Sequence, residues 1–149
     1  MEVLETLLEN SREMLKMVKK LGDVSEELTE ETLPKYGPLL GEVAKFLADK
    51  AINHLANEEA AFFPVLGAAL GKNDLIPTLL KEHREIYQAF NSFIRGVKEE
   101  SPADIAAAVV KIVRLLPSHL KHEADELYPQ AKEKLDKEDW EEIKKRLRA

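Results

Sequence analysis

Two segments of the chain are near copies of each other, and each carries a histidine followed four residues later by a glutamate. The first segment, HLANEEAAFFP, starts at His54, and the second, HLKHEADELYP, starts at His119. On an α-helix, side chains four positions apart project from one face, so each imidazole lies beside its carboxylate. The two pairs are His54 with Glu58 and His119 with Glu123. Two such pairs on separate helices predict a dinuclear metal site inside a helical bundle.

Apolar residues recur with the period of an α-helix along the chain, and no segment alternates as a strand does. The pattern predicts an all-α protein, an up-down-up-down four-helix bundle with a short fifth helix at its C-terminus. A chain of 149 residues is long enough to bury one core and too short for two ordinary ones. We therefore expect one metal-binding domain that spans residues 1–149.

Glycine and proline residues predict where the first three helices begin and end. The first helix is expected to stop at Gly22. The second is expected to close at Pro64 and the glycines at 67 and 71. The third is expected to begin near Asn73 or Asp74 and to fade at Gly96.

The last two helices have clear start signals. Ser101 precedes a proline at 102 and an acidic residue at 104, which is the pattern of a helix N-cap. Pro117 is expected to kink this helix just before its metal ligands. Asp136 is expected to cap the short last helix, whose docking face carries Trp140, Ile143 and Leu147.

The composition limits the metals and partners that the chain can take. It has no cysteine, so a metal must be held by nitrogen and oxygen atoms, which suits iron, manganese or zinc. The net charge is −6 and no basic patch is visible, which argues against binding to nucleic acid. We find no signal peptide and no apolar run of membrane-spanning length, so we expect a cytoplasmic protein that does not engage a membrane.

A second internal repeat relates the first and third helices. LLENSREML, which starts at Leu7, matches LLKEHREIY, which starts at Leu79. In this alignment Ser11 corresponds to His83. The chain therefore reads as a duplicated helix pair, with a small polar residue at a position where the repeat predicts a metal ligand.

Together these motifs resemble the hemerythrin family, specifically its hemerythrin-like HHE cation-binding domains, over almost the whole chain. The WEEI segment at 140–143 is similar to the usual C-terminal tail of that family. The resemblance implies two iron ions joined by an oxo or hydroxo bridge, or another divalent metal. Carried over to this chain, it assigns one ion to His54, the other to His83 and His119, and the bridging carboxylates to Glu58 and Glu123.

Two positions depart from the family pattern. Ser11 stands where the first-helix histidine is expected, and Tyr87 stands four residues after His83, where true hemerythrins carry another histidine. The missing first-helix ligand opens one ion further, which favours reaction over reversible oxygen carriage. Tyr87 is either a phenolate ligand or a core aromatic residue with a hydrogen-bonded hydroxyl.

His122 is the one histidine that the repeat does not explain, since the equivalent position in the first copy is Asn57. It lies roughly 60° around the helix from His119, so it either replaces the missing ligand or sits at the edge of the bundle. A competing register pairs His122 with Glu126, but it breaks the spacing to the proline that both copies share. We include His122 among the candidate ligands.

The predicted function is that of a non-haem dinuclear iron protein that binds or reacts with dioxygen, nitric oxide or peroxide in sensing, detoxification or a redox response. One alternative is a mononuclear or non-redox metal protein, for iron handling or for zinc. Another is a helical scaffold that binds a protein partner and whose metal site is vestigial. The sequence does not indicate whether the chain is an enzyme.

Overall fold

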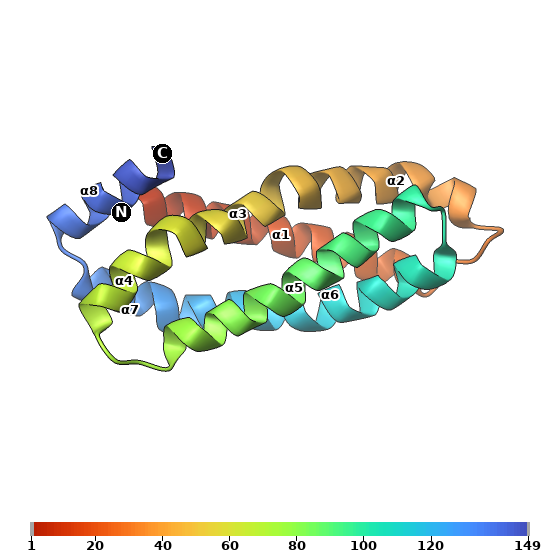
Figure 1. Ribbon diagram of the computed structural model, residues 1–149. Coiled ribbons are helices and arrows are strands. Elements are labelled where there is room, and N and C mark those ends of the chain that lie inside the picture. The colour runs from red at the N-terminus through yellow and green to blue at the C-terminus, as the bar shows by residue number, and fades with distance from the viewer. Residues whose placement is uncertain (1, 149) are drawn as a thin grey trace.

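The computed structural model describes residues 2–148, which are helical apart from short connections and contain no strand. Four long rods lie side by side, and a short helix packs at one end (Figure 1). The expected all-α class is confirmed. The rods are α1 (Glu2–Ser25), α2 to α4 (Leu33–Phe46, Ile52–Asn57 and Phe63–Leu70), α5 (Leu75–Lys98), and α6 with α7 (Pro102–His122 and Tyr128–Lys134), and the short helix is α8 (Lys137–Arg148).

The rods with more than one label are continuous, because π-helical turns join their helices. These turns cover Leu47–Ala51, Glu58–Phe62 and Glu123–Leu127. Helix α6 packs along both α5 and α1, and α2 packs against α5 and α1. No helix within residues 2–148 combines the length and the apolar composition that crossing a membrane requires.

Two clusters of apolar side chains fill the bundle, and a layer of buried polar side chains separates them. The larger cluster includes Leu55, Ile86 and Leu116, and the other includes Leu79 and Leu127. In each of the last three rods, histidine or glutamate interrupts the apolar stripe between residues of the two clusters. Burying such groups costs free energy unless they are paired, so this layer interrupts the apolar packing at a cost to stability.

The first helix does not stop at Gly22, as the sequence predicted, but continues to Ser25. Val24 is only 8% exposed and extends the apolar stripe of α1 one turn beyond Leu21. A glycine inside a helix costs about 1 kcal/mol relative to alanine, and burying a valine side chain stabilises by a similar or larger amount. Packing, not the glycine, therefore sets the end of α1.

The prediction for the end of the second helix is right at Gly71 but wrong at Pro64, because the rod continues through the proline to Leu70. Just before the proline, the backbone N–H of Phe63 donates to the carbonyl of Glu58, five residues earlier. Proline has no N–H and its ring collides with the carbonyl four residues back in a regular α-helix, so the wider π-helical turn accommodates it. The rod ends at Gly71, one of the two predicted glycines, whose φ of 71° suits glycine.

The starts of α5 and α6 agree with the sequence signals. Asn73 Oδ1 accepts from the backbone N–H of Ile76 at 2.9 Å, and Ser101 Oγ accepts from that of Asp104 at 3.4 Å. Helix α5 runs two residues beyond Gly96, where it was expected to fade. A Cβ at Gly96 would lie 3.1 Å from Ile105 Cγ1, so this glycine permits the close approach of α6 rather than ending α5.

Helix α6 continues through Pro117, which donates no backbone hydrogen bond of its own, as far as His122, and a π-helical turn follows. Asp136 caps α8 as expected, since its Oδ1 accepts from the backbone N–H of Asp139 at 2.8 Å. The docking face of α8 is shorter than expected, because Ile143 is fully buried whereas Leu147 is 39% exposed.

Candidate metal centre

Five buried polar side chains meet in the layer between the two apolar clusters. They come from α3, α5, α6 and the π-helical turns that follow α3 and α6. All five were candidate ligands in the sequence. They are His54, Glu58, His83, His119 and Glu123, each 2% exposed or less.

Four of them form a compact group in which one ligand atom of each lies within 4.8 Å of the others: Glu58, His83, His119 and Glu123. The Nε2 atoms of His83 and His119 are 3.1 Å apart. Nε2 of His119 is 3.5 Å from Glu123 Oε2. Glu58 Oε1 lies between two histidines, 3.4 Å from Nε2 of His83 and 3.5 Å from Nε2 of His54.

Two further glutamates, Glu59 and Glu82, determine which histidine nitrogen faces the centre. Glu59 Oε2 is 3.2 Å from Nδ1 of His83, and Glu82 Oε1 is 2.8 Å from Nδ1 of His119. An ionised carboxylate only accepts hydrogen bonds, so each Nδ1 carries the hydrogen and each Nε2 keeps its lone pair. At 3.1 Å, two lone pairs on these Nε2 atoms would repel each other unless a proton on one of them or a metal ion lay between them. The same carboxylate-to-imidazole arrangement orients histidines that bind metals.

The unpaired atoms of the centre also fit a cation. Within residues 2–148, four buried atoms have no hydrogen-bond partner: both ring nitrogens of His54, Glu58 Oε1 and Glu123 Oε2. Burial raises the pKa of Glu58 well above its usual range, and the negative charge of Glu123 raises it further. A divalent cation compensates two buried carboxylates that would otherwise repel each other.

Two of the three histidines of the centre are held in the neutral state that a metal requires. Burial lowers the pKa of His54 to about 4, and burial together with the neighbouring His119 lowers the pKa of His83. Both imidazoles are therefore neutral near pH 7 and can offer a lone pair to a metal ion. Burial opposes a charge on His119, but its contacts with Glu123 and Glu82 raise its pKa, so a metal ion bound there would displace a proton.

Two of the three π-helical turns begin at the two glutamates of the centre, Glu58 and Glu123. Each turn is followed by an aromatic residue and a proline, which is the part of the motif that both copies share. Single π-helical turns inside α-helices occur frequently at functional sites, because the extra residue changes the direction of the side chains around it. The shared aromatic residue and proline thus accompany the π-helical turn that sets the direction of each carboxylate.

Tyr128 belongs to the centre, although the sequence analysis did not single it out. Its side chain is 3% exposed, and its hydroxyl lies 3.4 Å from Glu58 Oε2 and 3.5 Å from Glu123 Oε1. Burial and then the two carboxylates raise the pKa of Tyr128, so the hydroxyl keeps its hydrogen and donates it. The equivalent residue of the first copy is Phe63, whose ring lies 5.2 Å from that of His83. The signal in the sequence was this exchange of phenylalanine for tyrosine at matched positions.

The chain matches the family model of the hemerythrin HHE cation binding domain over residues 2–131, a range that contains every residue of the centre. The chain belongs to this family. No curated protein and no solved structure matches it significantly.

The two departures from the family pattern have different surroundings in this hemerythrin HHE domain. Ser11 Oγ donates to the backbone carbonyl of Leu7 at 3.0 Å, within its own helix. The hydroxyl of Tyr87 donates to Glu59 Oε2 at 2.6 Å, the same oxygen that contacts His83. This contact favours the interpretation of Tyr87 as a core aromatic residue that holds an outer carboxylate in place.

His122, the sixth candidate ligand, lies outside the group of four. Its side chain is 26% exposed, Nδ1 is 3.1 Å from Glu82 Oε2, and Nε2 contacts Glu126. Both ring nitrogens are therefore directed at carboxylates at the edge of the HHE domain. The same Glu82 holds His119, so His122 reaches the centre only through an outer carboxylate.

Proposed function

We propose that this hemerythrin HHE domain, folded as an up-down-up-down bundle, is a non-haem dinuclear iron protein that binds or reacts with dioxygen, nitric oxide or peroxide. The observation that carries the proposal is the buried group of two histidines and two glutamates, in which Glu58 Oε1 and Glu123 Oε2 have no hydrogen-bond partner. Iron bound there supplies an open coordination position for a small ligand and the capacity to change oxidation state.

The ligands divide between two ions. His83 and His119 would hold one ion, and His54 would hold the other. Glu58 and Glu123 would bridge them, a role supported by the position of Glu58 Oε1 between His83 and His54. With Ser11 bonded within α1, an ion at His54 would have fewer protein ligands than the other and would be the one open to exogenous molecules.

The surrounding residues prepare the site for this chemistry. Glu59 and Glu82 keep the hydrogens on Nδ1 of the two histidines, which makes each Nε2 a stronger donor to a metal. The hydroxyl of Tyr128 donates toward the two bridging carboxylates from the side of α7. The apolar clusters above and below exclude water and so strengthen the electrostatic interactions within the layer.

A mononuclear metal protein is a second candidate, and one observation favours it. The compact group of four ligands leaves out His54, and its atoms alone surround a single position. In that case His54 would be an outer residue of the site.

Metal analysis of anaerobically purified protein distinguishes the two candidates. We expect two iron ions per chain and, after exposure to air, an absorption band from charge transfer to iron. One ion per chain would favour the mononuclear alternative. Zinc without an absorption band would exclude the redox function.

A further inference from the structure

The metal centre is closed to solvent, so an ion needs a route through the protein to reach it. Each of the five candidate ligands is 2% exposed or less. A buried metal site requires such a route, along which groups that bind metals replace the water molecules of the ion. Beside each histidine of the centre lies one feature that is open to solvent: a cavity at His54, the partly exposed Glu59 at His83 and the partly exposed Glu82 at His119.

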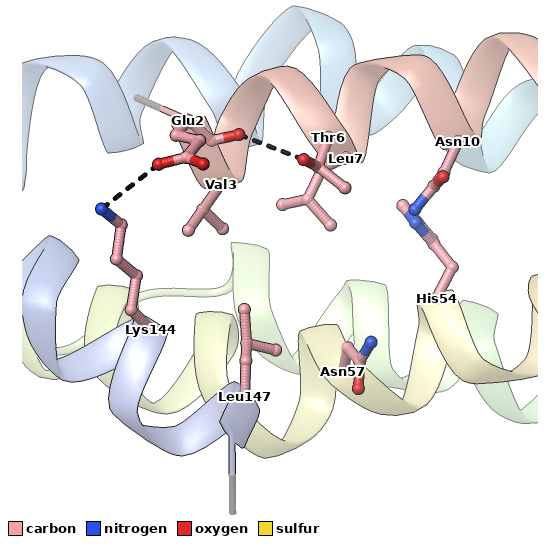
Figure 2. Close-up of a pocket in the computed structure, with 9 residues that line it drawn as sticks. All are labelled: Glu2, Val3, Thr6, Leu7, Asn10, His54, Asn57, Lys144 and Leu147. Atoms are coloured by element: carbon pink, nitrogen blue, oxygen red, sulfur yellow. Dashed lines mark hydrogen bonds and ion pairs between the residues drawn. The ribbon is translucent and has the colours of Figure 1, made fainter.

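The cavity at His54 offers no free carboxylate to an incoming cation. It lies between α1, α3 and α8 and has a volume of about 260 Å³ (Figure 2). Its one carboxylate, that of Glu2, is drawn at the far end from His54 and pairs with the ammonium group of Lys144 at 3.5 Å. Both ring nitrogens of His54 are buried, so an ion in the cavity would meet a positive charge and no ligand atom of the centre.

Glu59 offers only one step between the surface and the centre. Its side chain is 34% exposed, and Oε2 is 3.2 Å from Nδ1 of His83. The hydroxyl of Tyr87 donates to the same oxygen at 2.6 Å and so competes with a cation for it. No other histidine within residues 2–148 pairs with Glu59, so the metal-binding side chains do not continue outward from it.

At His119, by contrast, metal-binding side chains continue to the surface. Glu82 of α5 lies between two histidines, with Oε1 2.8 Å from Nδ1 of His119 and Oε2 3.1 Å from Nδ1 of His122. Nε2 of His122 contacts the carboxylate of Glu126, one helical turn further along. The exposed fraction of the side chain is 55% for Glu126, 26% for His122, 30% for Glu82 and 0% for His119. Carboxylates and imidazoles thus form an unbroken row from the surface to a ligand of the centre.

This row suits the transfer of an ion because none of its steps is a complete metal site. Within residues 2–148, the buried group of four is the only place where three or more such ligands can share one ion. His122 and Glu126, four residues apart, offer an ion two ligands at the surface. Two ligands hold an ion weakly, so the buried group, which offers more ligands and more charge, withdraws it. The carboxylates of Glu82 and Glu126 also raise the local concentration of cations.

We propose that Glu126, His122 and Glu82 form the route by which divalent metal ions reach the centre. Glu126 and His122 capture the hydrated ion at the surface and pass it to Glu82, whose carboxylate already lies against His119. The proposal rests on the proposed function in that the centre is taken to bind metal. It gives His122, which lies outside the group of four, a role in metal uptake rather than in holding the bound ion.

Stopped-flow measurement of cobalt(II) uptake by the metal-free chain tests the route, together with equilibrium titration of the same protein. Glu126→Gln and His122→Gln should each slow uptake about tenfold, at the low end of the gain that charged surfaces give to association rates. The equilibrium affinity for cobalt should stay unchanged, because a route alters the rates of uptake and release alike. Higher ionic strength should slow the native chain and reduce its difference from Glu126→Gln.

Asp125→Asn is the matched control for charge. Asp125 is next to Glu126 and is 57% exposed, but its carboxylate pairs with Lys121 at 2.6 Å, away from the route. The variant removes the same charge as Glu126→Gln and should take up cobalt as fast as the native chain. Asn57→Trp, which fills the cavity of Figure 2, should also leave the rate unchanged.

The double variant of Glu126→Gln and His122→Gln gives a second measurement. If the two residues act in series on one route, the double variant should be no slower than His122→Gln alone. Two effects that multiply would instead show independent actions and would overturn the route.

The remaining outcomes separate the route from the metal function. If both single variants take up cobalt as fast as the native chain, the route is wrong although the centre stands. If cobalt affinity falls together with the rate in His122→Gln, His122 is a ligand of the bound ion and the route is equally wrong. The route also fails if Asp125→Asn or Asn57→Trp slows uptake as much as Glu126→Gln does. A native chain that binds no cobalt would refute the metal function itself, and the route with it.

Discussion

Glu58 is the residue on which the centre depends most, since one of its oxygens lies between His83 and His54. Glu58→Gln should release metal with a loss of affinity beyond the roughly 10- to 100-fold caused by changes to outer partners. The metal-free variant should melt no lower than the metal-free native chain, because burial already favours a protonated Glu58 and glutamine keeps its shape. Calorimetry of both proteins with and without metal checks this. A drop in melting temperature of the metal-free form would show that Glu58 is structural instead.

Tyr128 acts on the metal only through the two carboxylates that its hydroxyl contacts. Tyr128→Phe keeps the ring, which is also the residue found at the matched position 63, and removes the donor. Metal affinity should fall about tenfold while the melting temperature of the metal-free chain stays within a few degrees. Tyr87→Phe is the matched control, because its hydroxyl contacts Glu59 rather than the bridging carboxylates. Equal effects of the two changes would contradict a specific role for Tyr128.

Five of the six candidate ligands converge, and four of them form two local pairs, since residues four apart share a helix face whatever the tertiary structure. His83 stands alone on its helix and belongs to no such pair. The outer partners were not visible in this way. Glu82 reaches His119 from another rod, 37 residues away in sequence, and Tyr128 reaches Glu58 across 70 residues. Such contacts depend on how the rods pack against one another, and the periodicity of the sequence does not predict that packing.

Among the helices, the sequence predicted starts better than ends. Side-chain caps such as Ser101 involve residues close in sequence and can be predicted from it, whereas the end of α1 depends on the burial of Val24 in the core. The passage of the second rod through Pro64 depends on a π-helical turn that a period of 3.6 residues does not describe.

Two glycines test whether packing or conformation matters at helix positions. Gly96→Ala should destabilise the fold by about 1–3 kcal/mol, because its Cβ would lie 3.1 Å from Ile105 Cγ1 and 3.2 Å from Ile105 N. Gly22→Ala, where nothing lies within 4 Å, should stabilise it by up to about 1 kcal/mol. Urea unfolding of the metal-free proteins measures both. The same sign for the two substitutions would show that α5 and α6 do not approach as closely as described.

The acid sensitivity of the whole molecule follows in part from His54. Burial lowers its pKa from 6.5 to about 4, so the unfolded chain takes up a proton first as the pH falls. The stability that a neutral His54 contributes is thus complete above pH 6.5 and is lost as the pH falls toward 4. By pH 5 the loss should reach about 2 kcal/mol. Unfolding of the metal-free native chain and of His54→Gln, each measured above pH 6.5 and at pH 5, isolates this contribution. Parallel pH profiles of the two proteins would contradict it.

The polar layer also has a consequence for how the molecule comes apart. It divides the apolar interior into two halves, and only the smaller half includes residues of α4, α7 and α8. Without metal, the two halves share no buried apolar cluster, so that half should open as a separate cooperative unit with faster amide hydrogen exchange. An ion held by residues of three rods would couple the two halves, since opening either half would require release of the ion. Metal should therefore slow exchange in α4 and α7 far more than in α2, and the chain should then unfold as one unit.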